Sequence, residues 1–430
     1  MRPHQSQCDE GTNTPEQSRI RVLLMASSMR GGGSEHQTAL LAEHLDRDRF
    51  DVHLYLTHPD GDRMASLPSD VRVHAGLPSE ERPTDAKDSG EPSALIRRMP
   101  GLALRRQAVD LCRLVEDLGI DVIYDRTFHM TLIAGHPVAR HGVPRVSTIV
   151  SPPDLALPTV EQRFISLKRR RLAKAYQSSQ CVVAVSQAAA DAASRYYELD
   201  PDRISVIRNP VDVEAIVSSA QHAAMPARSR ERSAPVRLVC VGRMSREKGQ
   251  ADLLNAFIEL AGRHDVAPMQ LRFIGDGPDR TNLEQIWSQA SSGHRLRPEH
   301  DVTFAGVRSP ATPEIAAADV LVLPSHFEGL PNVVLEAFAL RRPVIAARSG
   351  GTVELQHRDD QPTCYWAPPG DSVGLLNAIR RCLDDREHWP NRVENAWRLL
   401  QRRHRMDTAI GRIESRLILA TGDRCNRQRC

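Results

Sequence analysis

The chain has 430 residues, enough for two or three domains with separate hydrophobic cores. Its 40% hydrophobic and 26% charged residues are typical of a soluble α/β protein. The formal net charge of +3 gives no support for a nucleic-acid partner.

Features of membrane-spanning and metal-binding proteins are missing from the sequence. No run approaches the roughly 18 apolar residues of a membrane span, and the polar first residues lack the apolar segment of a signal peptide, so we expect a cytoplasmic protein. The eight cysteines form no CxxC pair, and Cys425 and Cys430 have no histidine at zinc-ligand spacing. We therefore expect structural thiols and no metal site.

Short apolar runs alternate with helical patterns from residue 19 to residue 217, after a polar tail, residues 1–18, that we expect to be disordered. The alternation predicts one doubly wound α/β domain. Its first strand, Arg21 to Ala26, leads into Gly31 to Gly33 and then a helix. A glycine loop before a helix lets backbone N–H groups approach an anion, but a flexible turn explains these glycines equally well.

The helix predicted over residues 163–180 carries four consecutive basic residues, Lys168 to Arg171. A solvated basic face is the simpler interpretation. The alternative is peripheral contact with anionic lipid at the inner membrane face, because Phe164, Ile165, Leu167 and Leu172 could supply an apolar side.

The second half of the chain repeats the α/β pattern. Residues 218–235 are rich in Ser, Ala and Arg without an apolar pattern, and we interpret them as a linker. Residues 236–390 predict a second doubly wound domain. We expect one long Arg-rich helix over residues 391–420 to pack back on the first domain, followed by a basic tail, residues 421–430.

One βαβ unit stands out in the second domain. Apolar runs predict buried strands at Val320–Leu323 and Val344–Ala347. The loop between them holds Glu328 and precedes a helix with Asn332 as N-cap and Glu336 one turn later. Ligands of open α/β sheets bind at such strand ends.

Charged residues also gather after the first strand of this domain, where Arg243 and Lys248 follow Gly242. Two cations beside backbone N–H donors suit a diphosphate. A carboxylate that accepts two hydroxyl hydrogens suits a ribose or a sugar diol. The combination predicts a nucleotide-sugar pocket between two domains.

Seven motifs, in order along the chain, carry a family resemblance. They are GG-x-E from Gly32, VIRNPVD from Val206, VGRMSREKG from Val241, FIGDGP from Phe273, FAG from Phe304, FEGLPNVVLEAFALRRPVIA from Phe327, and SGGTVEL from Ser349. From residue 20 to about residue 400, the chain resembles the retaining glycosyltransferases of family 4, also called group 1. This resemblance implies the GT-B fold, in which two Rossmann-like domains face each other across a cleft.

The resemblance also implies roles for individual residues. Arg243 and Lys248 would neutralise the donor diphosphate and stabilise the departing nucleotide, and Glu328 would contact the donor sugar, so these three are the predicted catalytic residues. Glu336 would hold the ribose hydroxyls. The other predicted donor-binding residues are Gly32, Gly33, Asn209, Gly242, Gly275, Gly306, Gly329, Leu330, Pro331 and Asn332. No metal and no other cofactor would be needed.

The sequence departs from the family in two places. A histidine common at the end of a first-domain strand is absent from residues 147–154, STIVSPPD. His129, after the preceding strand, could approach the cleft or be a structural histidine. Residues 357–366 lack the usual Asn-Gly pair. In the front-face retaining mechanism the leaving phosphate can take the acceptor proton, so a missing base does not exclude catalysis.

We therefore predict a retaining, metal-independent glycosyltransferase that uses a nucleotide-sugar, by family preference a UDP-sugar, and a glycan or lipid-linked acceptor. One alternative is a non-catalytic binding or regulatory protein, suggested by the absent histidine. The other is a nucleotide-sugar epimerase of the same architecture, which would need additional acid and base groups in the cleft.

Overall fold

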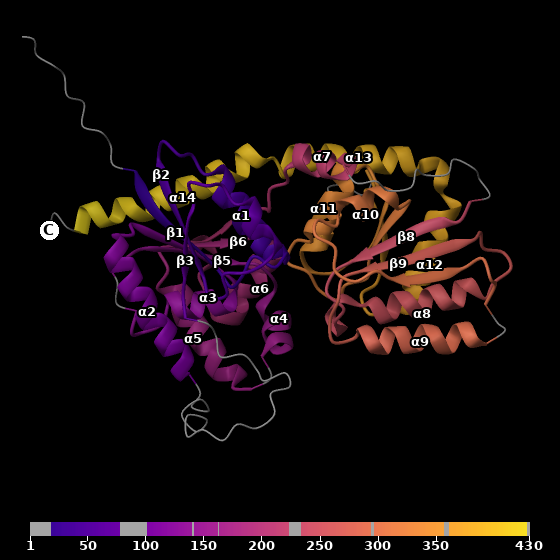
Figure 1. The fold of residues 1–430 in the computed structure, drawn as a ribbon, viewed down its shortest axis with the longest axis horizontal. Coiled ribbons are helices and arrows are strands. Elements are labelled where there is room, and N and C mark those ends of the chain that lie inside the picture. Colours follow the sequence, from indigo (N-terminus) through magenta and orange to yellow (C-terminus); the bar gives the residue numbers. More distant parts are fainter. Residues whose placement is uncertain are drawn as a thin grey trace, which may run out of the picture.

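The structure, a computed structural model, describes residues 19–77, 101–139, 142–161, 163–222, 234–293, 296–356 and 361–427. The predicted disordered tail, most of the predicted linker and the last three residues lie outside these ranges. Figure 1 shows two α/β bodies side by side, with the C-terminal helices running along one side of both.

The first domain is built on a seven-stranded parallel sheet in the order β3-β2-β1-β4-β5-β6-β7. Its strands are β1 (Ile20–Ala26), β2 (Phe50–Leu56), β3 (Arg72–Ala75), β4 (Val122–Arg126), β5 (Arg145–Ile149), β6 (Cys181–Ala184) and β7 (Ile204–Val206). Its helices are α1 (Gly33–His44), α2 (Leu102–Leu118), α3 (Thr127–Ala134), α4 (Pro153–Val160), α5 (Ile165–Gln177) and α6 (Gln187–Tyr197).

The second domain has a six-stranded parallel sheet in the order β10-β9-β8-β11-β12-β13. Its strands are β8 (Val236–Val241), β9 (Met269–Ile274), β10 (Asp301–Phe304), β11 (Val320–Leu323), β12 (Val344–Ala347) and β13 (Cys364–Ala367). Its helices are α7 (Val213–His222), α8 (Gln250–Ala261), α9 (Arg280–Ser292), α10 (Thr312–Ala317), α11 (Asn332–Ala339), α12 (Ser372–Asp384) and α13 (Trp389–Arg403).

Local sequence explains why these elements form. All four residues of β11 are buried, as expected for a central parallel strand covered on both faces. In α2, Ala108, Leu111 and Val115 are buried at helical spacing, and Gly119 ends the helix in the left-handed conformation that a side chain disfavours. The two doubly wound parallel sheets confirm the predicted fold class.

The predicted boundary between the first domain and the linker, at residues 217 and 218, is wrong. Residues 218–222 belong to α7, which packs on α10 and α11 of the second domain. Ile216 is buried within a core cluster made mainly of second-domain residues. The chain therefore crosses between the domains before α7, because the apolar side of that helix is covered by the second domain.

The single helix predicted over residues 391–420 is two helices, α13 and α14 (Met406–Arg427), and the predicted basic tail begins inside α14. α13 packs on α11, whereas α14 lies on β4 and β5 of the first domain. At the break, the N–H of Val211 donates to the carbonyl of His404 at 3.1 Å, and Val211 pairs with Arg405 as an isolated bridge. α13 ends at this point because the backbone at His404 and Arg405 pairs with Val211, in the segment that leads from the first domain to the second.

Candidate functional site

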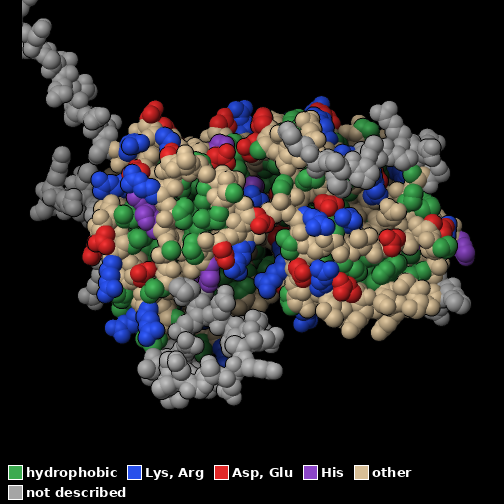
Figure 2. All heavy atoms as spheres, viewed as in Figure 1, with side chains coloured by type: hydrophobic (Ala, Val, Ile, Leu, Met, Phe, Trp, Pro, Cys, Tyr) green, Lys and Arg blue, Asp and Glu red, His purple; other side chains and the backbone are tan. Residues whose placement is uncertain are grey.

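The carboxyl ends of both sheets border one cleft between the domains, with a volume of about 910 Å³. Figure 2 shows the hollow between the two halves, with basic and acidic side chains beside it. Every predicted site residue except Gly306 lines this cleft: Gly32, Gly33, Asn209, Gly242, Arg243, Lys248, Gly275, Glu328, Gly329, Leu330, Pro331, Asn332 and Glu336.

The first-domain wall contains the glycine loop and the start of α1. Gly31 has a φ of +97°, a left-handed conformation that favours glycine. Gly32 directly precedes α1, and no side chain caps the helix. The free backbone N–H groups at this helix start can bind an anion that enters the cleft.

Three glycines support each other on the second-domain wall. The N–H of Gly275 donates to the carbonyl of Gly306 at 2.8 Å. A Cβ at Gly275 would lie 2.1 Å from the carbonyl oxygen of Gly242, so only glycine fits there. Gly306 thus supports Gly275 from behind and is not among the residues that line the cleft.

The two predicted phosphate-binding cations differ in their contacts. Arg243 is exposed to the cleft, and the described residues give its guanidinium no ion pair. The Lys248 ammonium donates to Oε1 of Glu328 at 2.7 Å. Arg243 can therefore bind an anion directly, whereas Lys248 would have to give up its ion pair with the Glu328 carboxylate to bind one.

The loop that carries Glu328 is held by glycines. The N–H of Gly351 donates to the carbonyl of Glu328 at 3.0 Å. A Cβ at Gly329 would lie 1.8 Å from the carbonyl oxygen of Val150 in the first domain. The loop thus approaches the opposite domain through its backbone, within the segment, residues 147–154, where the resemblance predicted a histidine.

Asn332 does not cap the helix, contrary to the prediction. It is the first residue of α11 and makes no side-chain cap. Its amide nitrogen donates to the carbonyl of Gly33 at 3.0 Å, and its amide oxygen accepts from the amide of Asn209 at 2.9 Å. Because a first-domain acceptor competes for its side chain, Asn332 joins the donor loop to the opposite wall.

Glu336 is partly exposed at the cleft wall, yet the surrounding protein raises the pKa of its carboxyl to about 7 by removing it from water. The positive charge of Arg63, from a 3-10 helix at Asp62–Ser66 in the first domain, opposes this shift. Arg63 also lines the cleft. The residue proposed to hold a ribose therefore faces an arginine from the other domain.

Three first-domain arginines in the cleft, Arg30, Arg63 and Arg126, were missed by the sequence analysis. Arg30 precedes the glycine loop and pairs with Asp60. Arg126 ends β4, and its position at a strand end was the available signal. Arg63 lies in a loop region between strands and gave no signal.

His129 does not replace the missing histidine in this structure. It lies on α3, and the cleft-lining residues do not include it. Its environment lowers its pKa, mainly through burial, with Glu161 and Lys168 as charged neighbours. Within the described ranges, no three His, Cys, Asp or Glu side chains gather as metal ligands would. Metal independence itself stays a prediction.

Sequence profiles match both domains. Residues 31–215 match "Glycosyltransferase Family 4", and residues 235–385 match "Glycosyl transferases group 1". The chain is 34% identical over 149 residues to the lipopolysaccharide core biosynthesis glycosyltransferase LpsD of Rhizobium meliloti. This match covers 34% of this chain and 39% of that protein. It is 34% identical over 160 residues to the alpha-D-kanosaminyltransferase of Streptomyces kanamyceticus, covering 36% of this chain and 38% of that protein. Each of these matches spans about two fifths of the length of the relative.

Solved structures match nearly the whole chain. Anabaena Alr3699/HepE in complex with UDP and glucose has a TM-score of 0.69 at 20% identity, covering 92% of this chain and 99% of that one. Sucrose-phosphate synthase from Thermosynechococcus elongatus has a TM-score of 0.72 at 17% identity, covering 92% and 98%. The predicted GT-B fold is confirmed, and the chain belongs to the family 4, group 1 glycosyltransferases.

Proposed function

We propose that this protein transfers a sugar from a nucleotide-diphosphate donor, a UDP-sugar, to a glycan or lipid-linked acceptor, with retention of configuration and without a metal. The observation that carries the proposal is that one cleft brings together Arg243, Lys248, the glycine loop at the start of α1 and the carboxylates Glu328 and Glu336. The choice of uracil as the nucleobase is supported by the structure of the similar Anabaena protein, which was solved in complex with UDP.

The cleft can stabilise the charge that develops when the sugar leaves. Arg243 and Lys248 would lie against the diphosphate, where preorganised positive charge lowers the barrier. The α1 N-terminus would add backbone N–H donors from the opposite wall. Glu336 would accept the ribose hydroxyls in its ionised form, and Glu328, once released by Lys248, would accept sugar hydroxyls. The acceptor hydroxyl would lose its proton to the leaving phosphate.

A panel of UDP-, GDP- and ADP-sugars tests the donor. A ligand present at about 100 times its Kd stabilises the folded state by about 2.7 kcal/mol, which raises the unfolding temperature. We expect the largest rise with a UDP-sugar, followed by slow hydrolysis in which the released sugar first appears as the retained anomer by NMR. A protein that neither binds nor hydrolyses any of the nucleotide-sugars contradicts the proposal.

The same assay separates the two alternatives. A binding or regulatory protein would show the thermal shift without turnover, and an epimerase would convert the sugar of the donor without releasing the nucleotide. A histidine of the cleft would not supply the acid that an epimerase needs. His36 is the only histidine among the described cleft residues, and burial, aided by Arg63, lowers its pKa to about 3. It would therefore be uncharged at neutral pH and a poor proton donor.

We also propose that the α4–α5 face rests on anionic lipid. No described helix is both long and apolar enough to cross a bilayer. The large side chains of Leu155, Val160, Phe164 and Leu167 are nevertheless 44–59% exposed in this region. Lys168 and Arg169 are paired with Glu161 and Glu198, so the apolar side chains and not the whole basic run would make the contact.

Co-sedimentation with vesicles of neutral or anionic lipid tests this surface. We expect binding to anionic vesicles that weakens with salt and with the double substitution Phe164→Ser, Leu167→Ser. The proposed lipid contact is contradicted if the wild type and the double variant are recovered equally in the pellet. It is also contradicted if the wild type shows no salt-sensitive binding.

A further inference from the structure

Arg126 is a buried arginine to which the described residues give no carboxylate partner. It ends β4 with 5% of its surface exposed, and its Nε atom has no hydrogen-bond partner. Its one side-chain hydrogen bond within the described ranges runs from Nη1 to the hydroxyl of Tyr124 at 3.1 Å. Removing a guanidinium charge from water is unfavourable unless an anion accompanies it, so this arginine requires an explanation.

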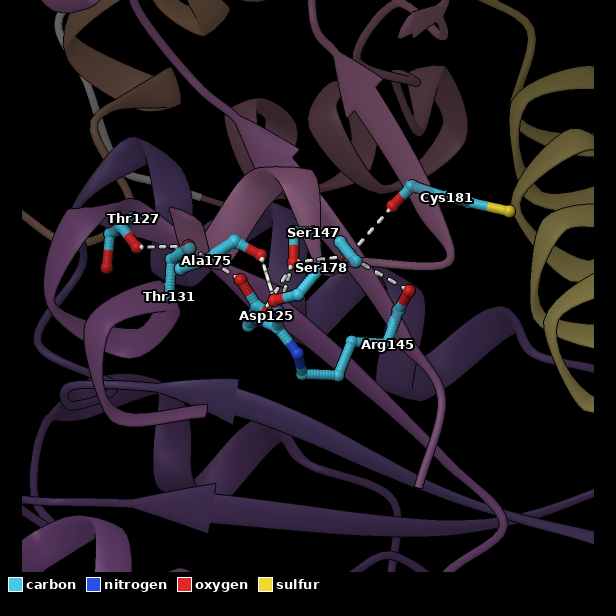
Figure 3. A network of polar contacts seen from close by, with 9 residues as sticks. Asp125, Thr127, Thr131, Arg145, Ser147, Ala175, Ser178 and Cys181 are labelled. Carbon is cyan, nitrogen blue, oxygen red and sulfur yellow. Dashed lines mark hydrogen bonds and ion pairs between the residues drawn. The ribbon is translucent and has the colours of Figure 1, made fainter. Parts of the chain in front are cut away.

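The nearest carboxylate in sequence cannot neutralise Arg126, because neighbouring strand residues point to opposite faces of a sheet. Asp125 is fully buried on the other face, where Figure 3 shows it within its own polar network. It accepts from the hydroxyl of Thr131 at 2.6 Å and from that of Ser147 at 2.7 Å, and Arg145 lies 3.5 Å away. Asp125 is therefore committed elsewhere.

The surroundings of Arg126 contain a further unsatisfied group. Thr148 lies opposite Arg126 in the β4–β5 register, and its buried hydroxyl has no partner. Thr127, the next residue, has a φ of +70°, a strained conformation for a β-branched side chain. The Asp125 network extends to the start of α3, because the Thr131 hydroxyl oxygen also lies 3.0 Å from the carbonyl oxygen of Thr127 and can share its single hydrogen between the two acceptors. This network keeps the end of β4, and with it Arg126, in a fixed position.

Arg126 is among the residues that line the cleft from the first domain, and with Tyr124 and Thr148 it also borders an internal cavity of about 10 Å³. The predicted donor-binding cations, Arg243 and Lys248, come from the second domain. Arg126 thus offers an anion-binding guanidinium on the acceptor-side wall, at the strand ends where the family histidine is missing.

We propose that Arg126 is the anion-binding residue of an acceptor subsite and takes a phosphate or carboxylate group on the acceptor. This inference rests on the proposed function, which assigns the first-domain wall to the acceptor. The planar guanidinium matches either oxyanion through two parallel hydrogen bonds. The bound anion supplies the negative charge that the described protein residues do not place beside Arg126.

Calorimetric titration with inorganic phosphate tests the subsite in the full-length protein, with UDP kept saturating so that the donor phosphate positions are filled. We expect Arg126→Gln to weaken phosphate binding at least tenfold while UDP affinity changes less than twofold. Arg126→Lys should retain part of the phosphate affinity. Arg263→Gln is the matched control, since Arg263 is paired with Glu259 and is not among the residues that line the cleft; it should leave phosphate affinity unchanged.

Several outcomes would overturn the proposal. Unchanged phosphate affinity in Arg126→Gln would do so, and an equal loss of UDP affinity would assign Arg126 to the donor. A parallel titration with acetate distinguishes the two oxyanions: binding of either supports the subsite, and binding of neither contradicts it. Thermal unfolding shows whether Arg126→Gln is folded. If it is not, Arg126→Lys replaces it in the test, and a phosphate affinity between zero and that of the wild type supports the proposal.

Failure of the proposed function gives a different result. If the wild type does not bind UDP, phosphate is titrated into the protein alone, with Arg126→Gln compared to Arg243→Gln. If only Arg126→Gln loses phosphate binding, the proposed anion site is supported, and only the use of a UDP-sugar donor is contradicted. Loss only in Arg243→Gln would reject the site.

Discussion

Nζ of Lys248 lies 2.7 Å from Oε1 of Glu328, joining the loop after β8 to the loop after β11. The sequence analysis gave these residues separate roles, one on the diphosphate and one on the sugar. Under the proposed function their ion pair would couple the two roles, because a phosphate that binds the ammonium must compete with the carboxylate. Donor entry would release Glu328 toward the sugar hydroxyls at the moment when they arrive.

Removing the Lys248 ammonium should abolish most of the turnover. We expect Lys248→Ala to lower kcat by about 10²–10³-fold, because it deletes a charge aimed at the developing phosphate anion. Steady-state release of UDP measures the effect. Lys174→Ala, at an exposed position on α5, is the control with the same substitution. Wild-type turnover in Lys248→Ala would show that this ammonium does not stabilise the departing nucleotide.

Gly329 should not tolerate a side chain. A Cβ would lie 1.8 Å from the carbonyl oxygen of Val150, so Gly329→Ala must push the donor loop and the first domain apart. We expect kcat/KM for the nucleotide-sugar to fall at least about tenfold, since displacements of about 1 Å have costs of this size. Gly411→Ala, in α14 with nothing within 4 Å of the new atom, should keep full activity and gain about 0.5–1 kcal/mol of stability. Wild-type kcat/KM in Gly329→Ala would show that this contact does not position the donor loop.

The interdomain hydrogen bonds of Asn332 should contribute to both stability and donor binding. Asn332→Ala removes the donor to Gly33 and the acceptor for Asn209. We expect a loss of about 1–3 kcal/mol in urea unfolding and a higher KM for the donor. Asn395→Ala is the control, because that amide bonds the carbonyl of Pro362 away from the cleft. A lower stability with an unchanged KM would limit Asn332 to a structural role.

The raised pKa of Glu336 predicts a pH dependence of stability. Between its ordinary pKa of 4.5 and its folded value of about 7, the folded state binds more protons than the unfolded state. The contribution of Glu336 is therefore fully present below pH 4.5 and is lost as pH rises to about 7. Glu336→Gln removes this ionisation, so relative to wild type it should gain on the order of 2 kcal/mol between pH 5 and pH 8.

Urea unfolding of both proteins at several pH values checks this prediction. The difference between Glu336→Gln and the wild type should widen with pH and level off above about pH 7.5. Parallel pH profiles would mean that the pKa of Glu336 is not raised in the folded protein.

Much of the donor side of the cleft was predictable from sequence. The apolar runs at β8 and β11 fix strands whose ends carry Arg243 and Glu328, and parallel strand ends meet at one edge of a sheet. Residues near a strand end are thus brought together by local patterns. Gly306 shows the limit, because glycines that line the cleft and glycines that support them look alike in sequence.

The remaining features depend on contacts between segments far apart in the chain. Asn332 resembles a helix cap locally, but its side chain bonds Gly33 of the other domain. The break between α13 and α14 occurs where His404 meets Val211, which no local propensity indicates.

The sequence by itself determined the two doubly wound sheets and the donor half of the cleft, because hydrophobic periodicity and glycine loops are local signals. Only the tertiary structure decided which charges are paired. It joined Lys248 to Glu328, placed Arg63 opposite Glu336 and buried Arg126 with no counter-ion among the described residues. The physical reason is that electrostatic pairing depends on distances across the domain interface, which the spacing of residues along the chain does not encode.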